Sequence, residues 1–214
     1  RATGVAAGPR SSLLALLLYL LGVGRATRAT PSMTLPELIL ATLLALPRPP
    51  AEAHARSLSE AIASAAHASP LWTTGDGGEA HGSLPAGEVA TAAVLVGIGI
   101  HETGLQERLA RCRYRAGGEA DFGRSLGTWQ LLGRVSWGPF TRVELCSSDA
   151  RQAERAVTVL QIQARRAPKA GLAAWLRGFA TGSKGRDTRA GRELLADALR
   201  SCERFGVTCG PTPR

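Results

Sequence analysis

The sequence predicts a mainly helical fold in a single domain. Its 214 residues suit one domain with a terminal extension, because domains usually contain about 100 to 200 residues. Several segments place apolar residues at helical spacing, and proline, glycine or a capping residue marks their ends. The chain has no internal repeat, coiled coil or long low-complexity tract. We therefore expect one sizeable hydrophobic core built from helices.

The first predicted helix covers residues 34–46. Thr34 is a typical N-cap residue, and Pro36 and Glu37 suit a first helical turn. Pro47 then ends the segment. The capping residue and the proline stop both favour a helix here.

The next long apolar segment, residues 85–101, allows two interpretations. Val94 to Ile100 also resembles a short buried strand that contains glycines. The length of the segment favours a helix, and Pro85 and Glu88 suit a helix start.

Four further segments are predicted to be helical. One of them follows cap-type residues at 147–149, carries apolar residues on one face and arginines on another, and ends before Pro168. Residues 69–85 form a glycine-rich loop, and residues 112–147 are rich in turn signals. The four predicted helices are 57–67, 149–166, 170–179 and 188–202.

Residues 1–32 are predicted to lie outside the main domain. Ser12 to Val23 is apolar, has arginines on both sides, and is too short for a comfortable transmembrane helix. It resembles the apolar part of a secretory signal peptide. Because the only methionine is Met33, an over-extended reading frame is the alternative, and the main domain is predicted at 33–214.

The net charge bears on what the protein binds, and the cysteines bear on the compartment in which it is found. The net charge of +9 and the pI near 10.6 suit a polyanionic partner, either nucleic acid, an anionic membrane or an acidic wall polymer. The alternative is GC-rich coding, which the excess of arginine over lysine and the abundant alanine and glycine fit equally well. The cysteines lack metal-finger spacing. In an exported protein the simplest pairing is Cys112 with Cys146 and Cys202 with Cys209, although two other pairings, or free thiols, are also open.

The candidate catalytic residue is Glu102, which ends the nearly all-apolar run that starts at Ala90. A carboxylate in such a place resists ionisation, because desolvation disfavours its charged form. A general acid that works near neutral pH needs this property. Downstream, Trp129 and Gln130 offer an aromatic face beside an amide, a combination that binds sugars.

Around Glu102 the sequence resembles the lysozyme-like superfamily, in its lytic transglycosylase and goose-type lysozyme branch. Glu102-Thr-Gly is similar to the family's E-S-G element, and Gly127-Thr-Trp-Gln130 to its G-L-M-Q turn. Asp121 stands six residues before Gly127, as in the D-x-G-x-x-x-G run of goose-type enzymes. Residues 173–182 loosely match a later A-A-Y-N-x-G element. Trp129 replaces the family methionine and Ala180 the family asparagine.

This resemblance implies a lysozyme-like mainly α fold with a small β part, in which the glycine-rich turn region forms a substrate cleft. It also implies cleavage of the β-1,4 link between N-acetylmuramic acid and N-acetylglucosamine in peptidoglycan. Glu102 would be the general acid. Asp121 would be the base of an inverting hydrolysis, or Glu102 would act twice in a transglycosylation. The implied sugar contacts are Gly127, Trp129, Gln130 and Phe179.

The same resemblance implies no cofactor, no metal and no nucleic acid partner, and it favours a monomeric protein that is secreted, periplasmic or bound to the cell wall, without a stable membrane span. The rival class is an inactive lysozyme-like wall binder, followed by a basic nucleic-acid-binding domain. A zincin site is excluded because Leu105 stands where the second histidine is required. Walker A and G-x-S-x-G motifs are absent. His54, His67 and His81 are predicted to be surface residues.

Overall fold

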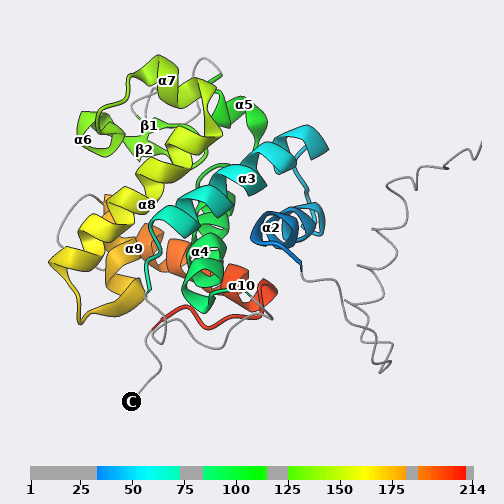
Figure 1. Ribbon diagram of the computed structural model, residues 1–214. Coiled ribbons are helices and arrows are strands. Elements are labelled where there is room, and N and C mark those ends of the chain that lie inside the picture. Colours follow the sequence, from blue (N-terminus) through cyan, green and yellow to red (C-terminus); the bar gives the residue numbers. More distant parts are fainter. Residues whose placement is uncertain (1–32, 73–83, 115–124, 182–187, 211–214) are drawn as a thin grey trace, which may run out of the picture. The chain divides into compact units, whose positions relative to one another are not determined.

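The computed structural model of the protein describes residues 33–72, 84–114, 125–181 and 188–210. Within these ranges the chain is mainly helical, which confirms the predicted fold class. The long helices are α2 (Leu35–Leu44), α3 (Glu52–Ala68), α4 (Ala86–Thr103), α8 (Asp149–Arg166), α9 (Gly171–Thr181) and α10 (Arg189–Arg204) (Figure 1).

The turn-rich region between α4 and α8 holds the small elements. They are α5 (Glu107–Ala110), β1 (Ser125–Leu126), β2 (Leu131–Leu132), α6 (Gly133–Trp137) and α7 (Arg142–Ser147). The two strands pair antiparallel, with Ser125 opposite Leu132 and Leu126 opposite Leu131. Residues 127–130 therefore form the turn of a short hairpin.

Local sequence signals explain where α2 and α8 begin. The backbone N–H of Thr34 donates a hydrogen bond to the Glu37 carboxylate at 2.8 Å, which completes a capping box at the start of α2. At α8 the Ser148 hydroxyl accepts a hydrogen bond from the N–H of Arg151. Both helices start where these capping residues place them.

Helix α3 begins earlier than predicted. It starts at Glu52 rather than at Ser57, because the residues that follow Pro50 are mostly good helix formers and nothing breaks them. The added turn brings His54 into the interior. His54 is 3% exposed, so its predicted surface position is wrong. His67 is exposed, as predicted, and His81 lies outside the described residues.

The ambiguous segment before Glu102 is a helix, and it lies at the centre of the fold. Most of α4 is buried, and α2, α3, α8 and α10 pack against it (Figure 1). Small residues let these helices come close. A Cβ atom on Gly97 would lie 2.5 Å from the Cα of Ala198 in α10, so only glycine fits there.

The described residues belong to one unit that extends from Met33. None of the helices in the described ranges combines the length and the apolar character that a membrane crossing requires. The predicted segment 1–32 lies outside these ranges.

Candidate functional site

Glu102 lies in the last turn of α4, where the chain leaves the core. Gly104 ends the helix in the left-handed conformation, with φ of 59°, and the buried Leu105 follows. Glu102 is half-buried, and none of the other described residues forms a hydrogen bond or ion pair with its carboxyl group. Burial raises its pKa to about 7, although the charge of His101 lowers it. At neutral pH a large share of Glu102 therefore carries a proton.

The hairpin turn at 127–130 packs against the same end of α4. The Thr103 hydroxyl, next to Glu102, donates a hydrogen bond to the carbonyl of Thr128 at 3.1 Å. The indole N–H of Trp129 donates to the carbonyl of Leu95 at 2.8 Å. The two motifs that the sequence singled out, separated by more than twenty residues along the chain, are therefore neighbours in the fold.

The structure corrects the expected role of Trp129. Its side chain is 0% exposed and belongs to the hydrophobic core, so the ring presents no face to a sugar in this structure. The carbonyl of Leu95 lies on the buried face of α4, and the indole hydrogen bond to it draws the ring inward. Trp129 therefore holds the turn on α4.

Gly127 and Gln130 shape the turn itself. Gly127 has φ of 73°, and a Cβ there would overlap the side chain of Gln152 in α8. The space next to Gly127, which the resemblance gives as a sugar contact, is therefore filled by the side chain of Gln152. Gln130 has φ of 46°, and its amide donates to the Gly127 carbonyl at 2.8 Å.

Gln152 is a buried residue that sequence reasoning missed. Its amide oxygen accepts from the N–H of Thr128 at 2.7 Å, and its amide nitrogen donates to the carbonyls of Ala110 and Leu145. One side chain thereby joins the hairpin turn to α5 and α7. A lone glutamine in an amphipathic helix carries no sequence signal for this role, because its partners come from distant segments.

The remaining predicted site residues have different outcomes. Phe179 is half-buried and packs against the hydrophobic core from α9. Asp121 lies outside the described residues, so its proposed partnership with Glu102 stays a prediction. Within the described ranges, no three His, Cys, Asp or Glu side chains gather into a group that could hold a metal ion.

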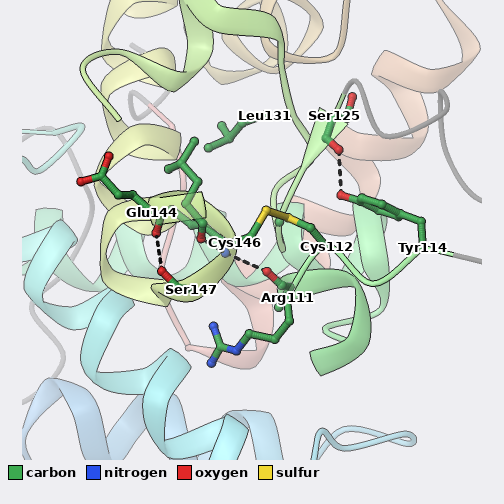
Figure 2. Close-up of a disulfide and its surroundings, with 12 residues drawn as sticks. Arg111, Cys112, Tyr114, Ser125, Leu131, Glu144, Cys146 and Ser147 are labelled. Carbon is green, nitrogen blue, oxygen red and sulfur yellow. Dashed lines mark hydrogen bonds between the residues drawn. A yellow bond between two sulfur atoms is a disulfide. The ribbon is translucent and has the colours of Figure 1, made fainter. Parts of the chain in front are cut away.

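Both predicted disulfides are present, Cys112 with Cys146 and Cys202 with Cys209. The Cys112–Cys146 disulfide joins the segment after α5 to α7 and so closes a loop that contains the β1–β2 hairpin (Figure 2). Nearby, the Tyr114 hydroxyl donates to the carbonyl of Ser125 at 2.7 Å, which attaches the same region to β1 (Figure 2). The second disulfide is buried at the end of α10.

His101, adjacent to Glu102, faces α10. Its Nδ1 lies 2.9 Å from the Asp197 carboxylate, whose other oxygen accepts a hydrogen bond from Arg200 at 2.5 Å. His101 and Asp197 are both about one-fifth exposed. The Asp197–Arg200 pair of α10 therefore lies against His101 in the last turn of α4.

A second buried carboxylate, Asp149, lies at the first position of α8. Arg111 binds it with two hydrogen bonds of 2.9 Å, and the Ser57 hydroxyl donates to it at 2.6 Å. Nδ1 of His54 is 3.7 Å away, too far for a good hydrogen bond, and the two groups form an ion pair only when the imidazole is protonated. Burial alone would raise the pKa of Asp149, yet His54, Ser57 and Arg111 together lower it to about 2.

This Asp149 cluster was not predicted from the sequence. Asp149 was expected only as a helix-start residue, and its partners come from α3 and from the segment after α5. A shallow hollow of about 410 Å³ above it is lined by several serines, Glu60 and Arg111. Most of the hydroxyls near Asp149 already bond within the protein, which is typical of a structural cluster.

No known family, curated protein or solved structure matches the chain.

Proposed function

We propose that the protein is a glycosidase that cleaves the glycan strands of peptidoglycan, with Glu102 as the general acid. The observation that carries this proposal is the Glu102 carboxyl, whose pKa is raised to about 7 and which has no bonded partner among the described residues. General acids require a group that still holds its proton near the working pH. The adjoining 127–130 turn, which resembles the lysozyme-like motif, supports the choice of substrate.

In this proposal the proton of Glu102 goes to the glycosidic oxygen as the bond from that oxygen to the anomeric carbon breaks. In a hydrolysis, Asp121 removes a proton from the attacking water, which an inverting mechanism requires. In a transglycosylation, the Glu102 carboxylate instead removes a proton from a hydroxyl of the same sugar, which closes an anhydro ring. The two routes leave different chain ends.

Export from the reducing cytosol fits the same proposal. The structure has two disulfides, and such bonds persist mainly in oxidising compartments. Peptidoglycan is also found outside the cytosol. We therefore propose a secreted, periplasmic or wall-associated protein, in which the positive charge of the chain favours anionic wall polymers.

The test is digestion of purified peptidoglycan by the wild type and by the Glu102→Gln variant, with mass spectrometry of the released fragments. We expect Glu102→Gln to slow the release about 10²- to 10⁴-fold. Reducing ends would identify hydrolysis, and anhydro ends transglycosylation. Glu107→Gln, a change at an exposed carboxylate just beyond the site, is the matched control.

Two results would contradict the proposal. Equal rates for wild type and Glu102→Gln would remove Glu102 from the chemistry. If neither protein releases fragments but both bind peptidoglycan, the protein is a wall-binding domain without activity. Asp121→Asn tests the base separately, because full activity of this variant would exclude Asp121 from the mechanism.

A further inference from the structure

The two disulfides differ in their exposure to solvent and in what they join. Cys202 and Cys209 are 3% and 8% exposed, whereas Cys112 and Cys146 are only half-buried. The first pair is 7 positions apart in the sequence, and the second pair is 34 positions apart and joins two separate segments (Figure 2). Thiol reductants attack accessible sulfur atoms most readily. The Cys112–Cys146 disulfide is therefore the one that a change of redox conditions reaches first.

The segments that this disulfide joins also meet at the buried side chain of Gln152. Its Nε2 donates a hydrogen bond to the carbonyl of Ala110 at 2.9 Å and another to the carbonyl of Leu145 at 2.6 Å. Leu145 directly precedes Cys146, and Ala110 stands two residues before Cys112. The disulfide therefore helps to hold the two carbonyls at the spacing at which one amide nitrogen binds both.

These two hydrogen bonds fix the direction of the Gln152 amide. Because an amide has its donors on nitrogen and its acceptor on oxygen, the two carbonyls on the nitrogen side leave Oε1 to face the 127–130 turn. Oε1 accepts the N–H of Thr128 at 2.7 Å, and the carbonyl of Thr128 accepts from the Thr103 hydroxyl of α4 at 3.1 Å. The peptide groups on both sides of Thr128 are therefore held in place, one of them by the Gln152 amide.

The backbone at both ends of this connection has a conformation that needs support. Cys112 has φ of 54° and Gln130 has φ of 46°, in the left-handed region that residues other than glycine rarely adopt. Residues keep such a conformation only where their surroundings hold them in it. After the disulfide is broken we therefore expect Cys112 to leave this conformation.

We propose that the Cys112–Cys146 disulfide is a redox-sensitive lock that holds the 127–130 turn in place through the amide of Gln152. In the reduced protein α7 is no longer tied to the segment after α5, so the Gln152 amide loses its fixed direction and Thr128 loses its acceptor. This lock deepens the proposed function and rests on it for its catalytic meaning, because the turn carries the implied sugar contacts.

The lock opens and closes by thiol–disulfide exchange. A thiolate of a small dithiol attacks one sulfur of the protein disulfide, the bond between Cys112 and Cys146 breaks, and the second thiol of the reductant then displaces the remaining protein thiol. The protein gains two electrons and two protons, and the dithiol loses both as it becomes a cyclic disulfide. Oxidised glutathione reverses the change, because its disulfide accepts the two electrons and two protons and leaves as two thiols. The turn is therefore fixed in an oxidising compartment.

Other contacts hold the rest of the fold after this bond is broken. Arg111, next to Cys112, has two hydrogen bonds to Asp149 that do not involve the disulfide, and the buried Cys202–Cys209 pair closes the end of α10. The core helices pack on α4 through apolar side chains. We therefore expect reduction to loosen the turn while α4 stays folded.

The experiment treats the whole chain with dithiothreitol under native conditions and follows hydrogen exchange of the Thr128 amide by NMR. Alkylation with iodoacetamide and mass spectrometry identify the reduced cysteines, which we expect to be Cys112 and Cys146. Exchange at Thr128 should become about 10-fold faster, because the amide loses its hydrogen bond. The amide of Val94 in α4 is the control for the fold and should keep its rate. Oxidised glutathione should restore the original rate at Thr128.

Two variants test the route from the disulfide to the turn. Cys112→Ser combined with Cys146→Ser should show fast exchange at Thr128 with or without dithiothreitol. Gln152→Leu keeps the approximate size of the side chain and removes its amide, so exchange at Thr128 should be fast in both redox states. The matched control replaces both cysteines of the other disulfide by serine, and its Thr128 amide should still respond to reduction.

The inference is wrong if Cys112 and Cys146 are reduced and exchange at Thr128 stays slow, or if Gln152→Leu leaves the response to dithiothreitol intact. It is also wrong if Val94 exchanges as fast as Thr128 after reduction, because the disulfide would then be a general stabiliser of the fold.

Release of peptidoglycan fragments by the oxidised and the reduced protein tests the catalytic meaning separately. If the turn responds as expected but the oxidised protein has no glycosidase activity, the proposed function is overturned and the lock stands. If the oxidised protein is active and reduction does not slow it, the turn has no part in catalysis and the lock does not control the enzyme.

Discussion

Glu102 and Asp149 are two carboxylates that the fold withdraws from water, and they differ in what surrounds them. Glu102 has no bonded partner among the described residues, and burial raises its pKa to about 7. Asp149 is more deeply buried, but Arg111, Ser57 and His54 hold its pKa near 2. Partners, and not depth, therefore decide which of the two holds a proton at neutral pH.

The helix ends reinforce the contrast. Asp149 is at the N-terminal end of α8, where the helix dipole favours a negative charge. Glu102 is in the last turn of α4, where the dipole disfavours one. The dipole of α8 thus favours the ionised form of Asp149, whereas the dipole of α4 favours the protonated form of Glu102.

The largest expected effect comes from removing Asp149. Asp149→Ala leaves the guanidinium of Arg111, whose side chain is 24% exposed, without its carboxylate and opens a gap beside His54. Breaking a buried pair from one side costs about 3 to 5 kcal/mol, so we expect the free energy of unfolding to fall by about that amount. Urea unfolding followed by circular dichroism measures it.

The control for this variant is Glu52→Gln, which breaks the exposed pair of Glu52 with Arg56 on α3. Exposed pairs of this type contribute little, so its unfolding midpoint should stay close to that of the wild type. If Glu52→Gln lowers the stability as much as Asp149→Ala does, the loss in Asp149→Ala cannot be assigned to the burial of the Asp149–Arg111 pair.

The ionisation of Glu102 should lower the stability of the folded protein as pH rises. Its pKa is higher in the folded protein than in the unfolded chain, so its stabilising contribution is complete below about pH 4.5 and is lost as pH rises through about 7. Between pH 4 and 8 the wild type should lose up to about 3 kcal/mol relative to Glu102→Gln. Chemical unfolding of both proteins at several pH values checks this.

If the two proteins keep a constant difference in stability over that range, Glu102 titrates near its ordinary value and cannot serve as a neutral-pH acid. Glu107→Gln again gives the reference for an exposed glutamate.

The ionisation of Asp149 should have the opposite effect: at low pH the free energy of unfolding should rise as pH rises. Its folded pKa is lowered, so its contribution is present above about pH 4 and is lost as pH falls through about 2. We expect the wild type to lose about 2 kcal/mol of stability relative to Asp149→Asn between pH 5 and 1. Acid unfolding of the pair, monitored by fluorescence, measures the difference, and parallel curves would contradict it.

The smallest expected effect is that of Ser57→Ala. This change removes one hydrogen bond to the Asp149 carboxylate and leaves Arg111 in place. We expect a loss of about 1.5 kcal/mol in the free energy of unfolding, the lower end of the range for a hydrogen bond to a charged group, because Arg111 still pairs with the carboxylate. A loss equal to that of Asp149→Ala would show that Ser57 and not Arg111 holds the cluster together.

Most of the long helices could be predicted because their signals are local. Thr34 with Glu37, Ser148 and the prolines act within one or two turns, and α2 and α8 accordingly begin where they were expected. The start of α3 was not predicted because its N-cap residue, Ala51, has no capping side chain, so Pro50 is the only local signal. Helices α5, α6 and α7 are too short to show a period in the sequence.

The candidate site was only partly predictable for a related reason. The position of Glu102 at the end of an apolar helix follows from the sequence alone, and so does the direction in which its pKa moves. The burial of Trp129 and His54, and the bonds of Gln152, depend on segments far away in the chain. A periodic pattern specifies the inward face of a helix but not which distant groups will meet it.

Gly97 places a limit on how this sequence can change over generations. Alanine is the smallest substitution at that position, and its single methyl group would lie 2.5 Å from the Ala198 Cα and force α10 away from α4. His101 on α4 and Asp197 on α10, which both lie close to this contact, would separate as well. A lineage that keeps the contact between His101 and Asp197 must therefore inherit a glycine one turn away, although that residue has no side chain that could take part in the contact.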